Sequence, residues 1–182
     1  DLALSDKLAS NVHKWAIGFA GSEGFATGLG GTATMVADVG AVIVLAFRTI
    51  HKIAMCYGYE VKSDEDKEFV LNILSVSGAN DMKEKKEALL ALKSDFLQKK
   101  IIEEVLMSNL VKKVAKQLGI NLTKRKLMQI MPIIGAGIGA AVNASYINDI
   151  AWTARRSYQL KWLADNEYIL SLIHISEPTR LA

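Results

Sequence analysis

A histidine and an arginine stand three residues apart in the stretch FRTIHK, and their types suit acid–base or anion-binding chemistry. If the stretch is helical, Arg48 and His51 lie on neighbouring positions of one face. A histidine beside a guanidinium can bind an anion, or transfer a proton at a lowered pKa. The alternative is a buried structural histidine and an arginine that pairs with an acid elsewhere. The pair is therefore a candidate site.

Three further polar residues could complete a site around this pair. Asp38 lies upstream in a glycine-rich segment, where it is either an acidic partner or a helix cap. Asn143 and Asp149 lie far downstream, in a predicted apolar helix. We hypothesise that Asn143 and Asp149 face Arg48 and His51 across the bundle, forming one polar cluster in an otherwise apolar core.

The segment around Trp152 places an acid, an indole and two arginines close together in the same predicted helix. Asp149 and Arg156 are seven residues apart, or two turns, so they share a face. Trp152 lies between them and can stack on Arg155 or Arg156. Solvent-exposed or structurally paired charges are the alternative to a functional role.

Other signatures of catalysis are missing from the sequence. Cys56 is five residues from His51, so the two side chains do not meet, and no Cys/His cluster has the spacing of a zinc site. The stretch GAGIGA lacks the strand and the last glycine of a dinucleotide-binding fingerprint. We therefore expect no metal and no cofactor. No motif supplies a nucleophile together with an oxyanion site, which favours a non-enzymatic protein.

A basic cluster, Lys124, Arg125 and Lys126, occupies a predicted helix start, where the helix dipole disfavours cations. A phosphate or an anionic lipid leaflet would offset this, the leaflet by about 1 kcal/mol per residue. Solvated charges are the alternative. No aromatic residue accompanies the cluster for base stacking, so we expect no nucleic acid. The predicted partner is an anionic membrane surface or a membrane protein, and no pattern specifies a small-molecule substrate.

An uncharged stretch, Leu127 to Ile147, is long enough to cross or dip into a bilayer, which takes about 20 residues. Pro132 and Asn143 oppose insertion. Gly135 and Gly139 are four residues apart, a spacing that lets two helix backbones pack closely. A buried helix of a soluble bundle and a membrane-dipping helix both fit the stretch.

Helices must position all these residues, because apolar residues recur at helical period along nearly the whole chain. Of the 182 residues, 51% are hydrophobic, which is enough to bury one core. We predict an all-α multi-helix bundle in which two Gly/Ala-rich apolar helices pack centrally. Lys and Arg number 22 against 19 Asp and Glu, an excess too small to indicate nucleic acid, and the single cysteine fits a reducing, cytoplasmic environment.

Caps and glycines mark the ends of the expected helices. Ser5 and Asp6 can start a first helix that runs to about Ala20, where Gly21 ends it. Ser63 caps a helix that carries three acids in its first turn and ends at Gly78. The other expected helices cover residues 39–57 with Gly58 as the C-terminal cap, 81–100, 101–118, a short helix between Thr123 and Pro132, and 134–168.

The last residues differ in character from the rest of the chain. LSLIHISEPTR, residues 170–180, corresponds codon by codon to the translated read-through of a transposase-based sequencing adapter. We therefore assign residues 1–169 to a single helical domain and residues 170–182 to a non-native tail, whose His174 and Glu177 form no site. Because the chain begins without methionine, we expect an incomplete N-terminus.

Three blocks of the sequence resemble the bacterial EcsC protein family over residues 24 to 168. They are the glycine-rich lead into RTIHKIAMCYGYE, the stretch EFVLNILSVSGA, and LTKRKLMQIMPIIGAGIGAAVNASYINDIAWTAR. One departure is the missing proline that the family pattern predicts near Val36 or Gly40. The family is named after a gene beside those for an ABC transporter, and because it has no established activity, the resemblance supplies no catalytic residue.

Three interpretations of function follow. The resemblance, the apolar stretch and the basic cluster favour a membrane-associated, non-enzymatic accessory module linked to ABC transport or secretion. The first alternative is a hydrolase with a polar cluster around His51, and the second is a soluble, partner-binding helical bundle. All three imply a cytoplasmic protein, and the first places it on the cytoplasmic side of the membrane.

Overall fold

The computed structural model describes residues 1–28, 32–79, 83, 86, 114, 116 and 135–168. Long helices dominate this part of the chain and no strand occurs in it, which confirms the predicted all-α fold. The four helices are α1 (Leu2–Gly28), α2 (Thr32–Cys56), α3 (Asp64–Gly78) and α6 (Gly135–Asp165). None of the described helices is long and apolar enough to cross a membrane.

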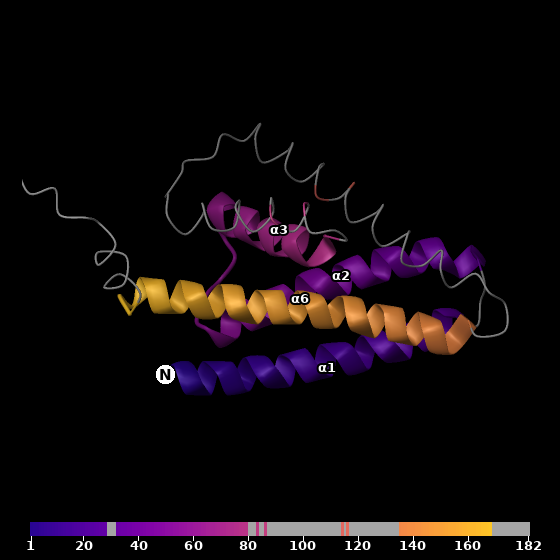
Figure 1. The fold of residues 1–182 in the computed structure, drawn as a ribbon, viewed down its shortest axis with the longest axis horizontal. Coiled ribbons are helices and arrows are strands. Elements are labelled where there is room, and N and C mark those ends of the chain that lie inside the picture. Colours follow the sequence, from indigo (N-terminus) through magenta and orange to yellow (C-terminus); the bar gives the residue numbers. More distant parts are fainter. Residues whose placement is uncertain are drawn as a thin grey trace, which may run out of the picture.

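Helix α6 packs against each of the other three described helices. In Figure 1 it runs antiparallel to α1 and lies between α1 and α3, with α2 behind it. Among the described helices, α1 and α6 form the most extensive contact. Alanines are buried on both helices, which allows close approach of the two backbones: Ala9, Ala16 and Ala20 on α1, and Ala151 and Ala154 on α6.

Larger apolar side chains fill the space between α2, α3 and α6. Ile50 and Ile53 of α2 and Ile147 and Ile150 of α6 are fully buried. Helix α3 buries a run from Phe69 to Leu74, more than one face of a helix. Burying a side chain of this size contributes about 1.5–3 kcal/mol, so this shared core holds the bundle together.

Three predicted helix boundaries were wrong. The first helix begins at Leu2, ahead of the predicted start at Ser5 and Asp6. Gly21 does not end the first helix, which continues to Gly28, and the second helix begins at Thr32 instead of Val39. A glycine inside a helix costs only about 1 kcal/mol, and the packing of α1 on α6 outweighs that cost. The residues from Thr32 to Asp38 include good helix formers such as alanine and methionine, and nothing in them stops a helix.

The helix ends marked by strong local signals were predicted correctly. Gly58 has φ 85°, and the amides of Gly58 and Tyr59 bond to the carbonyls of Met55 and Ala54, both at 3.0 Å. This pattern is a Schellman motif. Ser63 accepts a bond from the Asp66 amide at 3.1 Å, and the Asp66 carboxylate accepts one from the Ser63 amide at 2.9 Å, which completes a capping box.

The long C-terminal helix was also predicted, within a few residues of its observed bounds. The described end of the uncharged stretch packs inside the bundle, since Asn143, Tyr146 and Ile147 are buried. The expected helices over 81–118, the short helix between Thr123 and Pro132, and the tail lie outside the described residues, apart from single positions.

Candidate functional site

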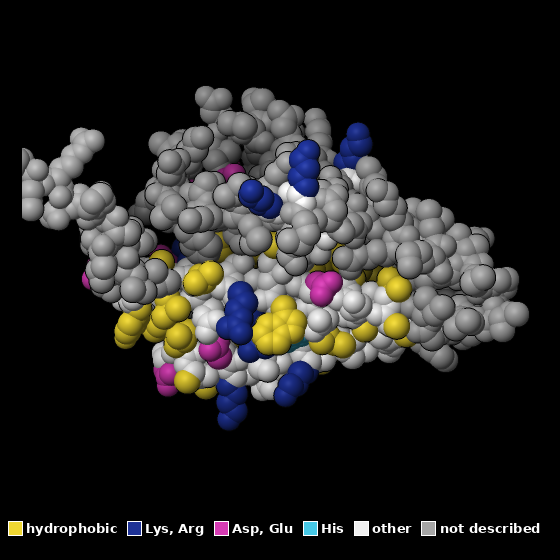
Figure 2. All heavy atoms as spheres, in the orientation of Figure 1, with side chains coloured by type: hydrophobic (Ala, Val, Ile, Leu, Met, Phe, Trp, Pro, Cys, Tyr) yellow, Lys and Arg dark blue, Asp and Glu magenta, His cyan; other side chains and the backbone are white. Residues whose placement is uncertain are grey.

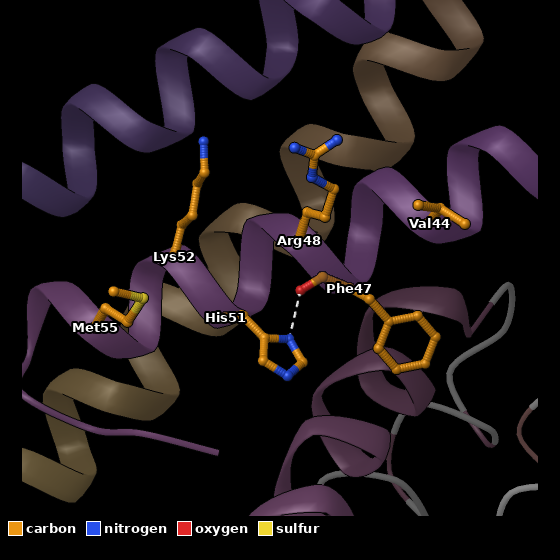
Figure 3. Close-up of a pocket in the computed structure, with 6 residues that line it drawn as sticks. All are labelled: Val44, Phe47, Arg48, His51, Lys52 and Met55. Carbon is orange, nitrogen blue, oxygen red and sulfur yellow. Dashed lines mark hydrogen bonds between the residues drawn. The ribbon is translucent and has the colours of Figure 1, made fainter. Parts of the chain in front are cut away.

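Arg48 and His51 line a shallow pocket of about 440 Å³ on the outer face of α2, open to solvent (Figure 3). The described residues that line it come from three turns of this one helix: Val44, Phe47, Arg48, His51, Lys52 and Met55. No acid is among them. In Figure 3 the side chains of Arg48 and Lys52 point toward one edge of this face, and the rings of His51 and Phe47 point toward the opposite edge.

The half-buried His51 ring is held by its own helix. Its Nδ1 lies 2.8 Å from the Phe47 carbonyl oxygen, and because a carbonyl only accepts, Nδ1–H is the donor. In the neutral ring this leaves Nε2 as an acceptor. Arg48 is exposed and forms no hydrogen bond or ion pair within the described residues. The arrangement provides cations and an acceptor beside an apolar wall, without a nucleophile.

The hypothesised cluster of four polar residues does not form. Asn143 is fully buried on α6 and Asp149 is half-buried there, whereas Arg48 is exposed on the outer face of α2. Within the described residues, neither Arg48 nor His51 bonds to Asn143 or Asp149. The helical period correctly placed each pair on its own helix, but the rotation of α2 directs Arg48 away from the core. The side chain of Asp38 lies outside the described part.

The histidine that contacts α6 is His13 of α1. Its Nε2 lies 3.0 Å from Oδ1 of Asn148, and its ring meets Trp152 edge-on at 5.4 Å. Burial of the ring lowers its pKa, the bond to Asn148 partly opposes this, and the nearby Arg155 lowers it further. His13 therefore favours its neutral form between α1 and α6.

Asp6 forms a second set of polar contacts on α1, seven residues before His13. Its carboxylate accepts a short hydrogen bond from the Tyr57 hydroxyl and another, at 3.1 Å, from the Gln159 amide nitrogen. Gln159 in turn accepts from Arg156 at 2.8 Å. Burial, together with the Asp6 carboxylate, raises the pKa of Tyr57, which keeps its hydroxyl a donor. This seam, formed by Asp6, His13, Tyr57, Asn148 and Gln159, links α1 to α6 and to the end of α2.

Sequence reasoning did not single out the seam. A usable signal was present, because Asp6 and His13 are seven residues apart and therefore share the face that carries the buried alanines of α1. No comparable signal identified Asn148 or Gln159 as the residues opposite.

The predicted stacking at Trp152 is confirmed. The guanidinium carbons of Arg155 and Arg156 lie 4.9 Å and 5.5 Å from the centroid of its ring. Trp152 is 44% exposed. On the face drawn in Figure 2, hydrophobic side chains lie along α6 and α1, with Lys, Arg, Asp and Glu side chains among them.

A strip of large apolar side chains lies exposed along α1. Leu4, Leu8, Trp15 and Phe19 follow one another at spacings of four, seven and four residues, so they form one stripe. Val44 and Met55 of α2 are 58% and 68% exposed. We call this surface the apolar–basic face; its members are Leu4, Lys7, Leu8, Lys14, Trp15, Phe19, Val44, Arg48, Lys52 and Met55.

The charges on the apolar–basic face are all positive. Lys7, Lys14, Arg48 and Lys52 are exposed, and no exposed acid occurs among the described side chains of α1 and α2. The described ion pairs lie elsewhere, such as Lys67 with Asp64 at 2.7 Å and Lys161 with Asp165 at 3.0 Å. Acids gather instead in the first turn of α3. The face is thus cationic as well as apolar.

Other predicted residues contribute less to a described site. Lys124, Arg125 and Lys126 lie outside the described residues, and Gly135 and Gly139 belong to the first turns of α6. Cys56 is half-buried, and burial raises the pKa of its thiol, which disfavours a reactive thiolate. Within the described part, no three His, Cys, Asp or Glu residues are grouped as metal ligands.

Comparison with known proteins supports the resemblance drawn from the sequence. The EcsC protein family matches residues 1–163. The uncharacterized protein YdbA of Bacillus subtilis (strain 168) is 31% identical over 161 residues, which cover 87% of this chain and 58% of YdbA. Protein EcsC of the same organism is 24% identical over 166 residues, covering 90% of this chain and 67% of EcsC.

The chain thus spans a little more than half the length of YdbA. No solved structure matches it. A family match over residues 1–163, together with a relative that is 31% identical, shows that the chain belongs to the EcsC protein family.

Proposed function

We propose that this chain is a non-enzymatic module that binds the anionic surface of a membrane through its apolar–basic face. The observation that carries the proposal is the exposed strip of apolar side chains on α1 and α2, bordered by four cations, with no exposed acid among the described side chains of these two helices. Helices that lie in a membrane interface combine these two features. The cytoplasmic leaflet carries the anionic lipid that such a face requires.

Two energetic terms support this mode of binding. Each lysine or arginine close to an anionic leaflet contributes about 1 kcal/mol, and this term weakens in salt. The exposed apolar side chains add about 25 cal/mol for each Å² that enters the acyl boundary. Trp15 is 48% exposed, and an indole has its preferred position at the interface between water and lipid. Together the two terms predict tight but reversible attachment.

The enzyme alternative has less support. A catalytic histidine requires a partner that orients it and a group on which it acts. His51 bonds to the carbonyl of its own helix, and its described neighbours in the pocket supply no acid or nucleophile. An accessory role in ABC transport or secretion remains an inference from the family resemblance, and a membrane surface is where such a role would be exercised.

Vesicle co-sedimentation tests the proposed function. The chain should bind vesicles that contain phosphatidylglycerol and phosphatidylcholine, bind pure phosphatidylcholine vesicles much less, and dissociate as salt is raised. Changing Arg48 and Lys52 together to glutamine should weaken binding by roughly tenfold or more, because two cations are lost from the face.

The matched control changes Lys62 and Lys67 to glutamine. These lysines are also exposed, but both pair with acids near the start of α3. This variant should bind as the parent does. Binding that is independent of lipid charge and salt would contradict the electrostatic part of the proposal. Absence of binding to any vesicle would contradict the proposed function and favour a protein partner for this face.

A further inference from the structure

The pocket on α2 lies on the α2 part of the apolar–basic face, and its lining combines apolar and positively charged residues. Val44, Phe47 and Met55 give it an apolar wall, and Arg48 and Lys52 place two cations at one border. Its volume of about 440 Å³ falls within the range of small-molecule sites, roughly 300–1,000 Å³. A ligand that fits both halves must be partly apolar and negatively charged.

The two cations stand in a relationship that favours an anion between them. Arg48 and Lys52 are four residues apart on one helix, and like charges at this spacing repel each other. Lys52 is held over the ring of Trp15, with Nζ 4.3 Å from the ring centroid. Arg48 has no acidic partner among the described residues. A phosphate would relieve the repulsion, and a guanidinium can hold two of its oxygens at once.

The apolar wall distinguishes a lipid from a free phosphate. Val44 and Met55 are eleven residues apart, so the wall extends about 16 Å along the helix axis, and both side chains are exposed. A solvated phosphate gains nothing from such a wall, whereas an acyl chain does. Because the pocket is shallow and open, a lipid could bind there without leaving its leaflet.

We infer that this pocket is a binding site for a single anionic phospholipid, with the phosphate at Arg48 and Lys52 and the acyl region along Val44, Phe47 and Met55. This inference rests on the proposed function and adds a defined lipid site to a general membrane attraction. Diffuse attraction depends on the number of cations, whereas a site depends on which cation is removed.

Nuclear magnetic resonance titration with dihexanoyl phosphatidylglycerol below its critical micelle concentration tests the inference without a bilayer. We expect saturable shifts centred on residues 44–55. Arg48→Gln should weaken the affinity by roughly tenfold, the loss typical of one charge-assisted hydrogen bond. Lys14→Gln, the same change of charge on α1, should leave the affinity within about twofold of the parent. Both side chains are exposed, so both variants should fold.

Two further ligands identify the class. Dihexanoyl phosphatidylcholine should bind at least about tenfold more weakly, because its net charge is zero. Inorganic phosphate should also bind weakly, since it does not use the apolar wall. Equal binding of inorganic phosphate would replace the lipid site with a simple anion site. Shifts that never saturate, or equal losses in Arg48→Gln and Lys14→Gln, would overturn the inference.

Vesicle co-sedimentation in parallel separates this inference from the proposed function. If vesicles bind but the short-chain lipid does not saturate, the lipid site is wrong and the membrane-binding function stands. If the short-chain lipid saturates at α2 but vesicles do not bind, the pocket is a lipid site on a protein that does not attach to membranes.

Discussion

The ammonium group of Lys52 on α2 lies over the indole ring of Trp15 on α1, with Nζ 4.3 Å from the ring centroid. Trp15 also stacks on Phe19, one turn further along α1, at 5.3 Å. The largest apolar side chain of α1 therefore lies at the surface beside cations, while alanines fill the inner side of the helix. Because large apolar side chains face solvent and small ones face the core, an apolar strip is exposed on α1.

Trp15 should contribute to membrane binding more than to stability. Trp15→Ala removes an indole that is about half exposed, and we expect it to weaken vesicle binding by roughly fivefold or more, from the lost apolar area. Trp152→Ala is the matched control, since Trp152 is similarly exposed but lies on α6. Co-sedimentation measures both. If the two variants lose affinity equally, the α1–α2 face is not the binding surface.

Acidification should destabilise the fold through His13. The folded pKa of His13 lies below its ordinary value of 6.5, mainly because the ring is buried. The unfolded chain therefore binds the proton more readily, so the stabilisation is complete above pH 6.5 and declines as the pH falls through the folded pKa. Urea unfolding between about pH 7.5 and pH 5 measures this decline.

His13→Gln should remove that component of the pH dependence, because glutamine can still donate to Asn148 but does not titrate in this range. His51→Gln, the same substitution on the outer side of α2, should retain it. An unchanged slope in His13→Gln would show that the decline arises from other groups.

Replacing glycine by alanine should have opposite effects on stability at two positions. Gly58 has φ 85°, a conformation that costs an alanine roughly 1–2 kcal/mol, so Gly58→Ala should destabilise by about that amount. Gly18 lies within α1, and nothing lies within 4 Å of a methyl group added there. Gly18→Ala should therefore stabilise by about 0.5–1 kcal/mol. Denaturant midpoints compare the two, and a stabilised Gly58→Ala would contradict the Schellman geometry.

The capping box should make α3 sensitive to acid. Burial opposes the charge on Asp66, but hydrogen bonds from the amides of Ser63 and Lys62 and from the Ser63 hydroxyl outweigh it and lower the pKa. The stabilisation is thus present above about pH 3.8 and is lost as the pH falls through the folded pKa. Asp66→Asn should flatten the stability profile in this acidic range.

Ser63→Ala tests the other half of the box. It should cost about 1 kcal/mol at neutral pH, the usual effect of losing an N-cap, and it should raise the pKa of Asp66 by removing one of its donors. Lys67→Gln serves as the control, because it removes an exposed ion pair that contributes little. Equal costs for the two variants would argue against the capping box.

Local chemistry was enough to predict much of this fold. The capping box of Ser63 and Asp66 uses only hydrogen bonds between residues close in sequence. The same is true of the Gly58 cap. These signals therefore determine where a helix ends, whatever the packing of the helices. The same holds for Trp152 and its arginines, which are neighbours on one helix. The prediction that Gly21 ends the first helix was wrong because the free-energy cost of a glycine within a helix is small compared with the stabilisation from packing α1 on α6.

The sequence by itself also determined the family and the helical period, and therefore that Arg48 and His51 share one side of α2. Only the tertiary structure decided which way that side faces. Rotating a helix about its axis does not change the spacing of its residues, but it decides whether Arg48 faces Asn143 in the core or solvent at the surface. The core took Ile50 and Ile53, because burying them is favourable and burying an unpaired guanidinium is not. The cations were thereby left on the apolar–basic face, and His13 became the histidine that contacts α6.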